Sequence, residues 1–271
     1  MLNNSMLEHE SLYRLGVFVG VMLLMMAWEA IAPARTDPVG RPRRWRTNLL
    51  MLLSGSVLLR LLAPISLVAI AGWAQQHDIG ALYLIDLSFS VKVLLAIVMF
   101  DMIIYWQHRL FHQIPWLWRL HQIHHADPHI DSTSGLRFHP LEILLSYGVK
   151  LVAVLLLGAP ALAIMLFEII LNASAIFNHS NIRLPARIEW PLRQIIVTQQ
   201  MHRIHHSQRP EETNSNYSFN LTVWDKLFGS YRKTATKTDQ ELDIGLVQYQ
   251  KPEQNSGLGY LLSLPFRRQK P

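Results

Sequence analysis

Most of the thirteen histidines in this chain stand in short, repeated spacings that suit metal binding. The segments HRLFH, HQIHH and HRIHH place their histidines three or four residues apart. Residues with these separations lie on one face of an α-helix, so each segment, if helical, presents two or three imidazoles together. The eight histidines are His108, His112, His121, His124, His125, His202, His205 and His206.

This number of imidazoles predicts two metal ions rather than one. A single ion takes about six ligands at most, and other histidines lie nearby in the sequence. Imidazole binds zinc, iron, copper and nickel alike, so the spacing leaves the identity of the metal open. The chain has no cysteine, which excludes thiolate zinc sites and Fe–S clusters.

The composition favours a membrane protein. Half of the 271 residues are hydrophobic and only 16% are charged, whereas a soluble domain usually carries about 25% charged residues. The net charge of +6 comes from basic residues beside apolar segments, which indicates topology signals and anionic-lipid contacts rather than nucleic-acid binding. We therefore expect no nucleic-acid partner.

Several apolar stretches are long enough to cross a bilayer, which takes about 20 residues. The last is interrupted by Gly158-Ala159-Pro160, a turn signal that predicts a helical hairpin. Arg60 and Pro64 fall inside the second, which predicts a snorkelling arginine, a contact with a partner helix or a break into two pieces. We predict an all-α integral membrane helical bundle of about four to five transmembrane helices with a histidine-rich dimetal cap. The predicted spans cover residues 11–31, 49–73, 87–106 and the hairpin 141–177.

The basic segment at residues 33–48 sets the predicted orientation. It contains five arginines against one acid, Asp37, and short basic segments of this kind remain in the cytoplasm. With five crossings, all the histidine segments then fall on the cytoplasmic side. The charge rule makes this assignment without reference to the histidines.

Smaller predictions concern single side chains and the tail. Asp101 lies seven residues before His108, on roughly the same helical face, where it could orient an imidazole or be an ordinary polar residue near a helix end. Glu212 stands in a polar loop and is expected to be exposed, as is His77. The residues after 232 are expected to be irregular, with 259–270 either on the membrane surface or disordered.

The three histidine segments, in this order and separated by the hydrophobic hairpin, resemble the fatty acid hydroxylase and sterol desaturase superfamily of integral-membrane di-iron oxygenases. Three further segments carry the resemblance: RFHPLE at residues 137–142, FNHSN around His179, and WDKLFGS at residues 224–230. The resemblance covers roughly residues 89–232. Within the superfamily, the chain is similar to bacterial members described only as sterol desaturase-like.

The resemblance implies that two iron ions occupy the site, although nitrogen ligands also accept zinc in an isolated protein. His129 has no counterpart in the family's pattern and is expected in a loop or in a supporting position. Carried over position by position, the family's ligands are His108, His112, His121, His124, His125, His179, His202, His205 and His206, with His139 as a tenth.

The activity implied by the resemblance is the O₂-dependent hydroxylation or desaturation of a C–H bond in a sterol, fatty acyl or related lipid, which would enter from the bilayer. A separate electron-donor protein is expected, because no cytochrome b5-like domain is fused to the chain. The implied location is the bacterial inner membrane. The expected division is into N-terminal membrane helices at 1–86, a catalytic domain at 87–232 and a cytoplasmic tail at 233–271.

The alternative hypothesis is a histidine-rich membrane protein that binds or transports metal without oxygenase activity. Transporters place polar ligands inside their spans near the midplane, whereas the histidine segments here lie just outside the predicted spans. A membrane zinc hydrolase is a weaker rival, because no histidine segment contains the glutamate that serves as general base in HExxH enzymes. All three segments are intact, which argues against an inactive relic.

Overall fold

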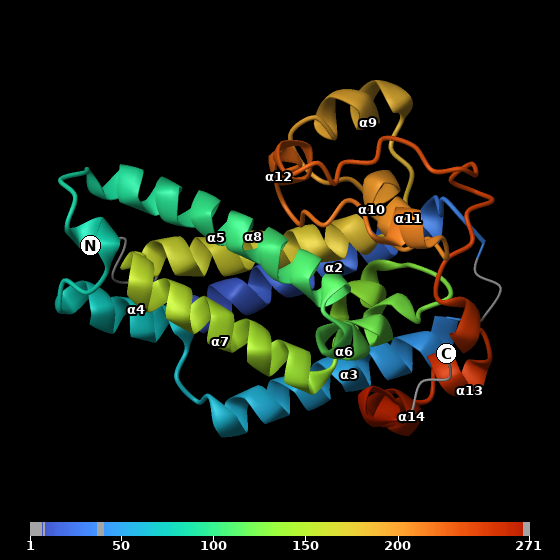
Figure 1. Cartoon of the computed structure of the whole chain (residues 1–271), viewed down its shortest axis with the longest axis horizontal. Helices are drawn as coiled ribbons and strands as arrows, with labels where there is room; N and C mark the ends of the chain where they lie inside the picture. Colours follow the sequence, from blue (N-terminus) through green and yellow to red (C-terminus); the bar gives the residue numbers. More distant parts are fainter. Residues whose placement is uncertain (1–6, 8, 37–40, 268–271) are drawn as a thin grey trace.

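The computed structural model describes residues 7, 9–36 and 41–267, and within these ranges the chain is all-α without a named strand. Long helices lie side by side along the longest axis, and short helices gather at one end and along one flank (Figure 1). Five helical segments are long and apolar enough to cross a membrane. The predicted all-α membrane bundle is therefore confirmed. The long helices are α2 (Glu10–Ile31), α3 (Arg41–Leu62) with its continuation α4 (Leu67–Gln76), α5 (Phe89–Gln113), α7 (Pro140–Leu157) and α8 (Ala161–His179).

The second span is broken into two helices, which is one of the three alternatives predicted from Arg60 and Pro64. Helix α3 ends at Leu62, two residues before Pro64, and the chain resumes as α4 after Ser66, whose side-chain oxygen accepts a hydrogen bond from the backbone N–H of Ala69. Helix α3 also begins earlier than the predicted span. Residues 41–48, expected to form part of a basic loop, are the first two turns of α3.

The third span is longer than predicted. Helix α5 continues seven residues beyond Trp106 to Gln113. This extension carries His108 and His112 on the last two turns, so the first histidine pair lies on the same rigid helix that crosses the membrane.

The hairpin between α7 and α8 has a tight turn at the end of the bundle opposite the histidines. Gly158 ends α7 in the left-handed conformation, with φ of 66°, and meets Gly80 (φ 112°) from the preceding connection. A Cβ atom on Gly80 would lie 2.0 Å from the backbone nitrogen of Gly158. Both positions therefore require glycine, and the predicted hairpin is confirmed.

Short elements form a cap over the histidine end. The tail after residue 232 is not a loose appendage, because Leu261 and Leu264 are buried against Met51 and Ile123. Residues 258–266 form α14 and η4, which contradicts the disordered alternative, and 268–270 lie outside the described residues. The cap elements are α6 (Pro115–His125), η2 (Ser132–Leu136), α9 (Ala186–Leu192), α10 (Gln199–His205), α11 (Pro210–Thr213), α12 (Val223–Leu227), η3 (Val247–Tyr249), α13 (Pro252–Asn255), α14 (Leu258–Ser263) and η4 (Leu264–Phe266).

Candidate metal centre

Nine of the ten histidines expected as ligands come together at one end of the bundle, in two groups. Within each group the ligand atoms all lie within 4.8 Å of one another. No carboxylate of the described residues belongs to either group. The five-histidine group contains His108, His112, His121, His125 and His205, and the four-histidine group contains His124, His179, His202 and His206.

The two HxxHH segments each contribute to both groups. Neighbouring residues on an α-helix point about 100° apart, and the rings of His124 and His125 are accordingly 5.4 Å apart at 87° to each other. His205 and His206 diverge in the same way, at 85°. The groups adjoin, because the rings of His125 and His206 stack at 4.3 Å. Each segment therefore links two candidate metal positions.

Hydrogen bonds from Nδ1 fix the orientation of four imidazoles. His108 donates to the backbone oxygen of Tyr217 at 2.7 Å, and His205 donates to that of Ser215 at 2.7 Å. His179 donates to the backbone oxygen of its own helix at Ala175, at 2.6 Å. His121 donates to the carboxylate of Glu142 at 2.6 Å. In a neutral imidazole, a proton on Nδ1 leaves a lone pair on Nε2, which is the arrangement of a metal ligand.

The facing Nε2 atoms fit a shared cation. Nε2 of His108 and Nε2 of His121 are 3.1 Å apart, although both carry lone pairs once Nδ1 is protonated. In the four-histidine group, Nε2 of His179 lies 3.0 Å from Nε2 of both His124 and His202. Nitrogens bound at 2.0–2.1 Å to one ion are separated by roughly 2.9–3.4 Å. These separations suit ligands of a common metal better than hydrogen bonds between the rings.

The imidazoles outside the spans are held in the neutral form that metal binding requires. Burial lowers the pKa of His121 to about 3. Burial, together with the neighbouring imidazoles, lowers the pKa of the other cap histidines well below the ordinary value; these are His124, His125, His202, His205 and His206. Several buried ring nitrogens, including both of His125, have no hydrogen-bond partner among the described residues. Buried, neutral imidazoles with free lone pairs are what a metal site needs before binding.

His139, the tenth expected ligand, lies in neither group. Its Nδ1 accepts a hydrogen bond from the backbone N–H of Leu141 at the start of α7, and its Nε2 contacts the backbone oxygen of Leu262 at 3.2 Å. His129 is also outside both groups, and its Nε2 lies 3.3 Å from the side-chain nitrogen of Asn181. His77 is exposed, as expected.

One of the two alternatives for Asp101, that it orients an imidazole, is wrong, and so is the exposed position expected for Glu212. Asp101 contacts no imidazole; it accepts hydrogen bonds from the side chains of Asn220 and Trp224 and from the backbone N–H of Leu221. It thereby fastens the loop after the third histidine segment to α5. Glu212 is fully buried and accepts hydrogen bonds from Ser207 and from the backbone of Thr236. Neither role has a signal in the local spacing.

Arg44 has a structural role, although the sequence predicts it in a basic loop. Its guanidinium is fully buried and pairs with Asp127 at 2.9 Å and Asp131 at 2.7 Å. Burial alone would raise the pKa of Asp127, but Arg44 and Arg137 outweigh it and lower that pKa to about 2. Helix α3 is therefore tied to the loop that follows the second histidine segment.

A cavity of about 270 Å³ opens between the membrane helices beside the five-histidine group. His108, His121 and Glu142 line it at one end. Most other lining residues are apolar and come from α3, α5, α7 and α8, among them Leu59, Phe111, Ile143 and Leu171. No member of the four-histidine group lines this cavity. Phe138 does, and its ring stacks flat on His124 at 4.5 Å.

The model of the fatty acid hydroxylase family matches residues 93–230, which contain both histidine groups. The chain is 29% identical over 155 residues to the ornithine lipid hydroxylase OlsE of Rhizobium tropici, covering 57% of this chain and 46% of that protein. It is 28% identical over 148 residues to the alkylglycerol monooxygenase of Danio rerio, covering 53% and 31%. It is 27% identical over 145 residues to the cholesterol 25-hydroxylase of Homo sapiens, covering 52% and 51%.

The matched part thus spans about half the length of these curated relatives, or less. No solved structure matches the chain.

Proposed function

The chain belongs to the fatty acid hydroxylase family, and from this premise we propose that it uses two iron ions, O₂ and electrons from a separate donor protein to oxidise a lipid C–H bond. The relatives named above are hydroxylases and a monooxygenase of lipids, which favours hydroxylation over desaturation. The observation that best supports this proposal is that His108 and His121 of the five-histidine group line a mostly apolar cavity between membrane helices, and that the four-histidine group adjoins the five-histidine group.

The nine grouped histidines would hold one ion in each group, and His139 is left out of the ligand set. When bound, the metals supply the O₂ reduction and C–H cleavage for which side chains alone are unsuited. The protein positions the ligands through the backbone oxygens of Tyr217, Ser215 and Ala175 and through Glu142. Glu142, when ionised, would add negative charge beside an otherwise neutral ligand set and so stabilise a bound cation.

The lipid chain would enter sideways from the bilayer and lie in the cavity between α3, α5, α7 and α8. Its lining is mostly apolar, with Lys150 and Glu168 paired to each other at 2.9 Å in the wall, and apolar surroundings exclude water from the reacting carbon. Because His108 and His121 form the end of the cavity, a chain that fills it brings a C–H bond to the five-histidine group. The metal-transport alternative is less well supported, since the histidines lie at one end of the bundle instead of along a path through it.

We place the histidine end on the cytoplasmic side, in a bacterial inner membrane. Arg41, Arg43, Arg44 and Arg46 begin α3, and Arg44 contacts Asp127 immediately after the second histidine segment. The arginine-rich segment and the metal centre therefore share one side of the membrane, and the positive-inside rule assigns that side to the cytoplasm.

The test is metal content and lipid oxidation of the detergent-purified protein, expressed with iron supplied. We expect about two irons per chain and an O₂- and reductant-dependent gain of one oxygen in a lipid, both lost in His124→Ala. His77→Ala is the matched control, because His77 is exposed and follows α4 at the opposite end of the bundle (Figure 1). Bound metal without any oxidised lipid would instead favour the metal-binding alternative.

A further inference from the structure

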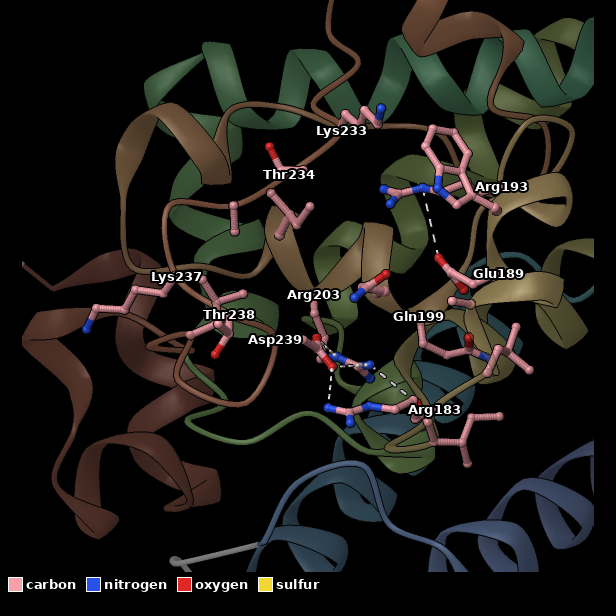
Figure 2. A pocket seen from close by; sticks show the side chains of 18 of the residues that line it. Arg183, Glu189, Arg193, Gln199, Arg203, Lys233, Thr234, Lys237, Thr238 and Asp239 are labelled. Carbon is pink, nitrogen blue, oxygen red and sulfur yellow. Dashed lines mark hydrogen bonds and ion pairs between the residues drawn. The ribbon is translucent and has the colours of Figure 1, made fainter.

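A second cavity, of about 670 Å³, lies in the cap on the side of α10 that faces away from the metal centre. It is lined by residues 182–184, by α9 and α10, and by the segment at 233–242, and Figure 2 shows the labelled side chains of these segments around it. The face of α10 in this cavity carries Gln199 and Arg203, whereas His202 and His206 on the same helix belong to the four-histidine group. The cavity is therefore separate from the candidate active site.

The cavity wall has excess positive charge. It contains two carboxylates, Asp239 and Glu189, against five cationic side chains: Arg183, Arg193, Arg203, Lys233 and Lys237. Asp239 is committed to Arg203, which it holds through two hydrogen bonds of 2.7 and 3.0 Å. Glu189 accepts a hydrogen bond from Thr198 and lies 3.9 Å from Arg193, too far for a hydrogen bond.

Arg193 and Gln199 carry buried donors without acceptors. Arg193 is 6% exposed, yet its Nε and Nη2 have no hydrogen-bond partner. The side-chain nitrogen of Gln199, which is 1% exposed, also has none. Buried polar groups in folded proteins are nearly always paired, and a guanidinium presents a planar fork of donors that matches a phosphate. An anionic oxygen group in the cavity would satisfy these donors.

Two of the other cations are near carboxylates: Lys237 pairs with Asp243 at 2.6 Å, and Arg183 lies 3.9 Å from Asp239. The fifth cation, Lys233, lies over the ring of Trp190 at 4.3 Å. In Figure 2, Lys233 and Arg193 lie on the side of the cavity away from the Arg203–Asp239 pair. Arg193, which is buried, and Lys233, which is exposed, are thus the two cations of the cavity that no carboxylate holds by a hydrogen bond or close ion pair.

Apolar side chains beside the cavity favour a lipid as the source of that anion. Ile188, Trp190 and Ile195, on and just after α9, are 45%, 49% and 64% exposed. Tryptophan and basic residues together are typical of the membrane interface, where they contact headgroups. We propose that this cavity binds the phosphate of an anionic phospholipid through Arg193, Gln199 and Lys233, while the exposed apolar side chains contact its acyl region.

The test is a native mass spectrometry titration of the full-length protein in detergent with phosphatidic acid and, separately, with diacylglycerol of the same acyl chains. Phosphatidic acid should bind about tenfold more tightly, and Arg193→Gln should remove that advantage, since a charged hydrogen bond is worth about this factor. Arg209→Gln is the matched control, because Arg209 is an exposed cap arginine outside the cavity, and it should bind as wild type does.

Inorganic phosphate added as competitor distinguishes a lipid from a soluble phosphate. The proposal predicts that it displaces the lipid only at far higher concentration; equal affinity would overturn the assignment to a lipid. Unchanged phosphatidic acid binding in Arg193→Gln would overturn the site itself. If Arg193→Gln lowers the melting temperature, Lys233→Gln provides a second test, because Lys233 is at an exposed position. Lys233→Gln should also lower the affinity for phosphatidic acid. Wild-type affinity in Lys233→Gln would then count against the site.

Discussion

The five-histidine and four-histidine groups adjoin but have different surroundings. His108 and His121 of the five-histidine group line the cavity between the membrane helices, and the side chain of Glu142 orients His121. No member of the four-histidine group lines that cavity, Phe138 stacks on His124 beside it, and all four members are fully buried. We infer that a metal in the five-histidine group meets the lipid, while one in the four-histidine group acts from behind it.

The largest expected difference follows from the number of ligands. His124→Ala leaves three imidazoles in its group, whereas His112→Ala leaves four in the other. We expect the His124→Ala variant to bind about one metal instead of about two and to lose at least a hundredfold in turnover. Mutating a residue that only hydrogen-bonds to a ligand already lowers metal affinity or activity by 10–100-fold. His112→Ala should keep both metals. Metal analysis and product assays of both variants check this, and an equal loss in the two would break the proposed distinction.

Glu142 tests whether the two groups can be perturbed separately. Glu142→Ala should weaken metal binding in the five-histidine group by about 10–100-fold, because His121 loses its acceptor. Glu142→Gln should retain much of the affinity, since its amide oxygen still accepts from Nδ1. The four-histidine group should be unaffected, because His179 donates to a backbone oxygen.

Chelator competition on the Glu142 variants would resolve one weakened and one normal metal. Two metals weakened to the same degree would show that the groups behave as one unit.

A larger side chain in the cavity should lower the rate of lipid oxidation without changing the binding of either metal. Ser146 lines the cavity on α7, and Ser146→Leu is expected to lower kcat/KM for the lipid by about tenfold, the effect of a few misplaced carbons in an apolar pocket. Val149→Leu, on the exposed face of the same helix, is the matched control. If Ser146→Leu lost metal, or kept full kcat/KM, the cavity would not be the route to the five-histidine group.

The smallest effect is expected at His139, outside both groups. His139→Asn keeps a side-chain acceptor at the start of α7, and His139→Ala removes it at a cost of about 1 kcal/mol in stability. Both variants should bind two metals, with a slightly lower melting temperature for His139→Ala alone. A metal lost in His139→Asn would restore His139 as a ligand and enlarge one of the groups.

Much of the candidate site follows from the sequence because helical periodicity is local. The spacing within HRLFH, HQIHH and HRIHH places histidines on shared helix faces, and the structure brings all eight together. The apolar stretches likewise predicted five membrane-spanning helices, since a bilayer demands a minimum length of apolar helix whatever the packing. The hairpin followed from Gly158 and Pro160, whose backbone preferences act at the position where they stand.

Tertiary structure alone decided which imidazoles share an ion. Adjacent histidines such as His124 and His125 point in different directions, and only the packing of α6 against α5, α8 and α10 determines what each one meets. The same holds for charged side chains. The sequence predicts Arg44 in a loop, Glu212 in an exposed loop and, as one of two alternatives, Asp101 beside an imidazole. Partners distant in sequence, Asp127, Thr236 and Trp224, instead hold them in buried positions. Local spacing fixes the direction of a side chain, but its partner is set by contacts between segments far apart in the chain.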